Sequence, residues 1–281
     1  MRTILPVVVI AAMAGICSSL PLQAAGSSGP AADAFVSATF AEAQRLFYSG
    51  RYDEAAALAL DVRSTNPEDL AAFELRSSAL LFQIRRVFGS PADKDKTWKL
   101  CAVCQELMSD FVAENTQGRS IARAKVEQDP ADDEALFLLG KLNLNYVWLQ
   151  LGTVGRKTGW SEYWEARKSL DALLNRNPRH VRARVARAWI DYIVDTKLPR
   201  GTRWLLGGGN RKRGLLVVQE AAQVEAPPFV RAEARFALWD MQVRERNLSG
   251  AVVTARALST EFPDNRELTK FITTHDLPSS R

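Results

Sequence analysis

The feature that most constrains the fold of this chain is a proline flanked by small residues at two fixed offsets. Pro178 ends a helical stretch, because its ring cannot continue a helix and the residue before a proline disfavours helical geometry. Ala166 lies twelve positions before it and Ala188 ten positions after it. Two helix backbones approach closely only where no bulky side chain separates them, so the pattern predicts a helix crossing. The same offsets recur at Pro67 with Ala55 and Ser77, at Pro130 with Gly118 and Gly140, and at Pro263 with Ala251 and Thr273.

This repetition resembles the tetratricopeptide repeat, a helix–turn–helix unit of about 34 residues. The first unit carries the clearest match, in Ala43, Gly50, Ala55, Val62 and Pro67. The segment LPRGTRWLLGGGNRKRGL also looks like exported bacterial members of this family. The resemblance implies an all-α solenoid, a right-handed superhelix of antiparallel helix pairs, that binds proteins and carries no catalytic residues. Helical periodicity without strand-like alternation predicts about twelve helices.

The first 24 residues have the layout of a secretory signal peptide. Arg2 supplies a positive start, an apolar run follows, and Leu22 and Ala24 fit the positions before a cleavage site. The apolar run is shorter than a transmembrane helix requires, and no other segment is long and apolar enough to cross a bilayer. We therefore expect a periplasmic or secreted protein with a signal peptide over 1–24, a flexible linker over 25–34 and a helical repeat domain over 35–281.

The three cysteines allow two kinds of chemistry. Cys17 could be lipidated and anchor the protein to a membrane, but Ile16 stands where that signal has a small residue. Cys101 and Cys104 lie in what we expect to be the middle of a long helix, where an exported protein could join them in a disulfide. A thiol redox site is an alternative, although it normally needs a helix amino terminus to lower the thiol pKa. Zinc would need a second ligand pair, and the sequence supplies none.

Charge and titratable residues argue against nucleic-acid binding and against catalysis. The 37 Lys and Arg residues exceed the 32 Asp and Glu residues only enough for a net charge of +5. This mild, dispersed excess of positive charge does not indicate a surface that binds nucleic acid. His180 and His275 are the only histidines, and neither belongs to a Ser–His–acid arrangement or a metal-ligand cluster. We therefore predict no catalytic residue, no metal and no cofactor.

A glycine-rich turn offers a candidate anion site. Gly208 and Gly209 precede Arg211 and Arg213 at an expected helix start, where free backbone amides attract phosphate. A Walker loop would need Lys and Ser or Thr after its last glycine, whereas apolar residues follow here. The other interpretation is a flexible turn that leads into a solvated, basic first turn of a helix.

The resemblance also implies where a partner would bind. The unit that starts at Val181 places Arg182, Val185, Trp189 and Tyr192 at positions 2, 5, 9 and 12 of its first helix, which line the concave face in this family. The preceding unit adds Phe137 and Lys141. Aromatic residues and arginines are common anchors of interfaces, so we expect these six side chains to grip a protein or peptide. One alternative is an accessory component of a periplasmic transport or envelope-assembly system that holds a small apolar or anionic ligand in the same groove. Another is that the rings merely fill gaps between helices.

Overall fold

Helices make up almost all of the chain that the structure describes. The computed structural model describes residues 30–156, 158–197 and 200–275. Within these ranges there are twelve α-helices and no strand, so the all-α prediction and its number of helices are confirmed. The predicted signal peptide and Cys17 lie outside the described residues.

Ten of the twelve α-helices in the described ranges form five antiparallel pairs, and two stand outside the pairs. The first helices of the pairs are α1 (Pro30–Tyr48), α3 (Leu70–Phe88), α6 (Asp133–Val147), α8 (Val181–Lys197) and α10 (Pro228–Arg244). Their partners are α2 (Tyr52–Thr65), α5 (Ala102–Gln128), α7 (Trp160–Arg176), α9 (Arg211–Ala221) and α11 (Leu248–Glu261). The remaining elements are α4 (Lys94–Leu100), the final helix α12 (Arg266–His275), a π-helix η1 (Trp148–Val154) and a 3₁₀-helix η2 (Arg200–Leu206).

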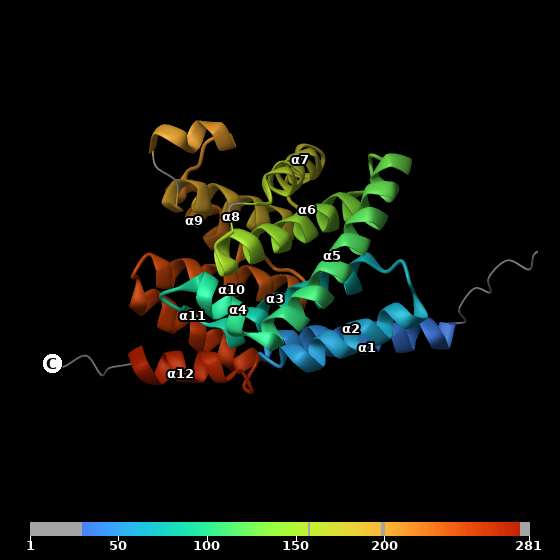
Figure 1. Cartoon of the computed structure of the whole chain (residues 1–281), viewed down its shortest axis with the longest axis horizontal. Helices are drawn as coiled ribbons and strands as arrows, with labels where there is room; N and C mark the ends of the chain where they lie inside the picture. The colour runs from blue at the N-terminus through green and yellow to red at the C-terminus, as the bar shows by residue number, and fades with distance from the viewer. Residues whose placement is uncertain (1–29, 157, 198–199, 276–281) are drawn as a thin grey trace, which may run out of the picture.

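The first helices of the five pairs form an inner ring. Along the ring, α1 contacts α3, α3 contacts α6, α6 contacts α8 and α8 contacts α10. The ring is completed by α10, which returns to contact α1. The partner helices α5 and α7 lie toward the outside of the molecule (Figure 1). The helical solenoid is therefore closed, because its last pair packs against its first.

Tyr48, at the end of α1, is the main contact across this closure. Its ring stacks on Phe229 and Phe236 of α10, with ring centroids 6.1 and 5.4 Å away. Asn265, in the turn before α12, donates from Nδ2 to the carbonyl oxygen of Tyr48 at 2.7 Å. Aromatic packing and a hydrogen bond thus join segments that are 217 residues apart in the chain.

The small residues that predicted helix crossings lie at those crossings. Ala166 is fully buried, and a Cβ added to Gly140 would meet Leu170 Cγ at 2.8 Å. A Cβ added to Gly214 would likewise meet the carbonyl oxygen of Ala188 at 2.8 Å. Thr273 is the exception, because it is exposed near the end of α12 and marks no crossing.

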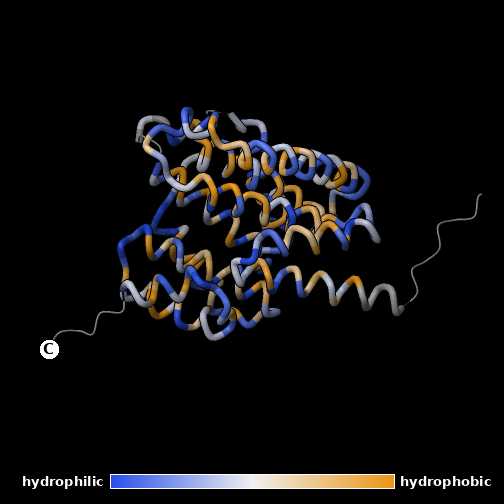
Figure 2. The backbone as a smooth tube through the Cα atoms, turned by 60° about the horizontal axis from the view of Figure 1, so that its bottom comes forward, coloured by the Kyte–Doolittle hydropathy of each residue, from blue (hydrophilic) through white to orange (hydrophobic). Residues whose placement is uncertain are grey.

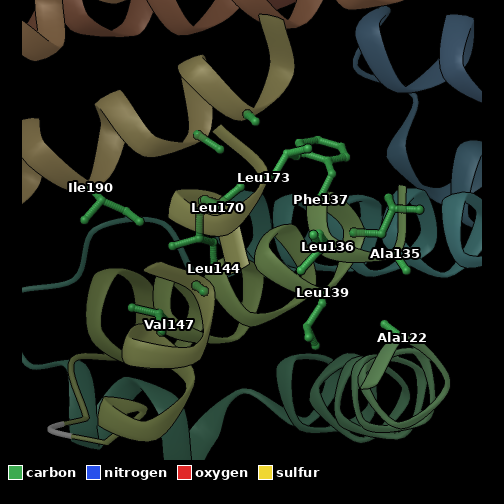
Figure 3. Close-up of a cluster of buried hydrophobic side chains, with 14 of the residues drawn as sticks. Ala122, Ala135, Leu136, Phe137, Leu139, Leu144, Val147, Leu170, Leu173 and Ile190 are labelled. Carbon is green, nitrogen blue, oxygen red and sulfur yellow. The ribbon is translucent and has the colours of Figure 1, made fainter. Parts of the chain in front are cut away.

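The helix α6 occupies the centre of the fold, and its residues are correspondingly buried. Most helices carry apolar and polar residues in alternation, as expected of helices with one buried face (Figure 2). In contrast, α6 is buried nearly all round. Its Leu136 and Leu139 belong to the same core cluster as Leu170 and Leu173 of α7 (Figure 3).

Two helix boundaries differ from the sequence prediction. The helix α1 begins at Pro30, inside the segment that we expected to be a flexible linker, because proline suits a first helical turn and alanines follow it. The long helix expected around the cysteine pair is divided: α4 ends at Leu100 and α5 begins at Ala102. Cys101 lies between them with φ −91° and ψ 84°, a conformation that no helix continues.

Candidate functional site

The face predicted to grip a partner is covered by the chain itself. Phe137, Val185 and Tyr192 are each only 2% exposed. Phe137 lies in the core cluster of α6 and α7, whereas Val185 and Tyr192 lie in the cluster that α8 shares with α9 and α10. These three side chains are buried in this structure, although Tyr192 also lines the open cavity beside η2. The sequence repeat did not reveal this, because the closure depends on contacts between distant pairs.

Four charged side chains from four inner helices meet within the ring, at the positions where the groove was expected. Glu74 of α3 and Glu233 of α10 surround Lys141 of α6, whose Nζ lies 3.7 Å from Glu74 Oε1 and 2.8 Å from Glu233 Oε1. Arg182 of α8 contacts the same two carboxylates: its Nη2 lies 3.4 Å from Glu74 Oε2, and its Nε donates to Glu233 Oε2. Two positive and two negative charges balance, as burial of charge requires. We call these four residues the inner charge cluster.

Opposite charges in the inner charge cluster keep Glu233 and Lys141 ionised despite burial. Burial by itself would raise the pKa of Glu233, but the positive charges of Arg182 and Lys141 outweigh it and lower that pKa to about 2. Burial would lower the pKa of Lys141, but the carboxylates of Glu233 and Glu74 raise it above its ordinary value. Glu233 and Lys141 are therefore both ionised at neutral pH, and their attraction holds α10 against α6.

Trp189, the remaining predicted contact, is partly buried and packed on several sides. Its ring meets that of Tyr192 edge-on at 5.6 Å and that of Trp148 at 6.4 Å. The guanidinium of Arg244, at the end of α10, lies 5.4 Å from the Trp189 ring centroid. Trp189 thus fills space between inner helices, which matches the alternative interpretation of these aromatic residues.

Cys101 and Cys104 are joined by a disulfide at the start of α5. Cys101 is the N-cap residue, because its Sγ accepts a hydrogen bond from the backbone N–H of Cys104 at 3.2 Å. Cys104 is fully buried and Cys101 is half-buried. The prediction that the pair lies mid-helix is wrong, and the objection to thiol chemistry that rested on it no longer holds.

The predicted anion site lies beside an open cavity of about 790 Å³ next to η2. Gly209 and Arg211 line this cavity, whereas Gly208 and Arg213 are not among its lining residues. The backbone N–H of Arg211 donates to Asp195 Oδ2 at 2.8 Å. A carboxylate of the chain itself therefore occupies the helix start where an external anion would bind.

His180 has a structural role at a helix start. His180 accepts a hydrogen bond at Nδ1 from the backbone N–H of Ala183 at 3.1 Å, which caps the start of α8. No group of three or more metal-ligating side chains occurs among the described residues. No helix in the described part of the chain is long and apolar enough to cross a membrane.

Two exposed tryptophans on α7 are the strongest candidate for a contact surface. Trp160 and Trp164 are each 44% exposed, and residues four apart on a helix are neighbours on one face. They fall outside the buried stripe of Ala166, Leu170 and Leu173 on the same helix. The sequence contained this signal, because their positions differ from those of the core stripe.

The contacts around these two rings fix α7 in place. Glu165 receives two hydrogen bonds from Arg123 of α5, at 2.6 and 2.7 Å. Tyr163 packs edge-on against Trp164, with ring centroids 5.4 Å apart, and donates its hydroxyl to the carbonyl oxygen of Leu206 at 2.8 Å. We call Trp160 and Trp164 the outer tryptophan face.

Comparison with known proteins finds a structural likeness, which is to a repeat protein of known structure. No protein-family model matches the chain, and no curated protein matches it. The crystal structure of a thermophilic TPR protein in Thermus thermophilus is similar, with a TM-score of 0.48 and 16% sequence identity. The similarity covers 86% of this chain and 100% of that chain.

Proposed function

We propose that this chain is an exported helical-repeat scaffold that binds a protein partner through the outer tryptophan face and catalyses no reaction. Export is supported by the leader pattern of residues 1–24. The observation that carries the binding proposal is the 44% exposure of both Trp160 and Trp164 on a helix whose core stripe is buried.

Two neighbouring tryptophans on a rigid helix are suited to protein recognition. Tryptophan is enriched among the residues that dominate binding energy, because its large ring buries much apolar area. The packing of Tyr163 and the ion pair of Glu165 with Arg123 already restrict α7. Little further conformational entropy is then lost when a partner binds. The matching surface on the partner is an apolar pocket or groove about one helical turn long.

The experiment begins with affinity capture from an envelope extract and continues with the purified partner. Trp160→Ala combined with Trp164→Ala should weaken the measured affinity at least ~30-fold, since loss of a hot-spot residue costs about 2 kcal/mol or more. A matched control replaces Leu100 and Val103, exposed apolar residues at the α4–α5 junction, by alanine. An unchanged affinity in the tryptophan variant, with its thermal melt preserved, would place the partner elsewhere.

A small-molecule carrier is the second candidate, and the cavity beside η2 favours it. Five cationic side chains line that cavity against two carboxylates, which suits an anionic ligand. These cations are Lys197, Arg203, Arg211, Lys212 and Arg244. Native mass spectrometry of the purified protein would detect such a ligand as added mass. If the chain is a scaffold, the measured mass should be that of the polypeptide alone. Capture of the protein partner should then depend on Trp160 and Trp164.

A further inference from the structure

The 3₁₀-helix η2 displays two large apolar side chains to solvent. Trp204 is 72% exposed and Leu205 is 53% exposed, which places both among the most exposed large apolar residues of the described chain. In Figure 1 this segment, coloured orange near residue 204, stands at the edge of the molecule beyond α8 and α9. Most of the Trp204 side chain and about half of the Leu205 side chain are therefore left in contact with solvent.

Contacts at the end of η2 hold this segment against α7. Arg167 of α7 donates from Nη1 to the carbonyl oxygen of Leu206 at 2.9 Å and from Nη2 to that of Gly207 at 2.9 Å. Gly207 has φ +74°, and a Cβ placed there would meet the Arg167 guanidinium carbon at 2.7 Å. Only glycine suits this turn, which anchors one end of η2 while Trp204 and Leu205 remain outside.

Three cations flank the exposed pair along the chain, with Lys197 before η2 and Lys212 and Arg213 after it. Lys197, Lys212 and Arg213 are exposed, and none of the three forms an ion pair with any residue in the described ranges. Lys212 and Arg213 lie in the first turn of α9, where positive charge is unfavourable to the helix dipole. Stability of α9 therefore does not explain their presence.

The carboxylates beside η2 are already engaged within the chain. Asp195 pairs with Arg203 and also accepts the backbone N–H of Arg211. Glu245 accepts a hydrogen bond from the Tyr192 hydroxyl at 2.7 Å. The charge left for an outside partner on this edge is consequently positive.

We infer that η2 and the start of α9 form a peripheral membrane anchor whose occupant is the surface of an anionic phospholipid bilayer. Tryptophan favours the headgroup level of a bilayer, where its ring is partly apolar and partly hydrated. Leu205 adds apolar area for the acyl boundary, and the three cations attract anionic headgroups. Lysine is depleted from the cores of protein–protein interfaces, so this combination fits lipid better than protein. The anchor goes beyond the proposed partner binding, because it uses a different surface.

Vesicle co-sedimentation at about 0.1 M salt tests the anchor with two lipid compositions. The purified full chain, without its leader, should bind vesicles of phosphatidylglycerol and phosphatidylcholine and should bind pure phosphatidylcholine far more weakly. Trp204→Ala with Leu205→Ala should lower the partition coefficient at least ~10-fold. Lys212→Ala with Arg213→Ala should lower it about 25-fold, since each cation near an anionic surface contributes about a fivefold factor.

Matched controls remove the same chemistry from α4 and its junction with α5. Lys96→Ala with Lys99→Ala removes two exposed cations, and Leu100→Ala with Val103→Ala removes two exposed apolar side chains. Both control variants should bind anionic vesicles like the parent. Quenching of tryptophan fluorescence by brominated lipid should decrease in Trp204→Phe.

Three outcomes would overturn the anchor. These are no binding to anionic vesicles, equal binding by the η2 variant and the parent, and a protein partner whose capture requires Trp204. Because capture through Trp160 and Trp164 is measured without lipid, failure of the anchor and failure of the proposed function remain distinguishable.

Discussion

Arg182 of α8 and Glu233 of α10 form an ion pair between the fourth and fifth helix pairs, across 51 residues of sequence. Glu233 also pairs with Lys141 of the third helix pair. One carboxylate therefore links three successive pairs from inside the ring. This position makes the inner charge cluster part of the ring closure rather than a surface for partners.

Replacing Glu233 by glutamine should destabilise the protein strongly. The change leaves two buried cations with one carboxylate, and breaking a buried pair by removing one partner costs about 3–5 kcal/mol. Chemical denaturation measures the change in free energy of unfolding. Glu267→Gln is the control, because its pair with Arg86 is about half exposed and should contribute about 0–1 kcal/mol. Equal effects of the two variants would contradict a structural role for the inner charge cluster.

Acid should weaken the fold through the same carboxylate. The folded pKa of Glu233 is lowered to about 2 from an ordinary value of 4.5. Its contribution to stability is therefore fully present above the unfolded pKa and is lost as pH falls from about 4.5 toward 2. The difference corresponds to about 3 kcal/mol at neutral pH. We expect the free energy of unfolding, measured by chemical denaturation from pH 6 to pH 2, to fall more steeply for the parent than for Glu233→Gln. The same pH dependence in both proteins would refute the role assigned to Glu233.

Ala166→Leu should overpack the crossing of α6 and α7. Ala166 is fully buried, and its carbonyl oxygen lies 3.5 Å from where a Cβ on Gly140 would stand. Inserting a larger side chain into such a contact costs about 1–3 kcal/mol. Ala257→Leu, on an exposed position of α11, should leave the unfolding free energy nearly unchanged. A neutral Ala166→Leu would show that the helix register is wrong.

Trp189→Ala should lower the free energy of unfolding, and it should not remove a direct contact with the partner. The ring packs on Tyr192 and Trp148, and its removal leaves a cavity between inner helices. We expect a loss of about 3 kcal/mol in the unfolding free energy. A thermal melt and a binding assay on the same variant separate the two effects. A fully stable variant with lost partner affinity would restore the inner face as the binding site.

Local patterns predicted the elements of the fold because helix formation and crossing depend on nearby residues. The spacing around Pro178 identified Ala166 and Ala188 as crossing residues, and both are buried. The break at Cys101 escaped prediction, since KLCAVCQEL carries no proline or glycine. The disulfide with Cys104 and the cap at the start of α5 are visible only in three dimensions.

The helix pairs and their close crossings follow from the amino-acid sequence alone, because small residues and prolines act at fixed distances along the chain. The closure of the pairs into a ring follows from contacts that form only in the folded molecule. Tyr48 meets Phe236, and Arg182 meets Glu74, across 108 residues in the second case. Such contacts have no fixed spacing in sequence, since they depend on the summed curvature of all five helix pairs. For the same reason Val185 and Tyr192 became core residues, while Trp160 and Trp164 remained outside.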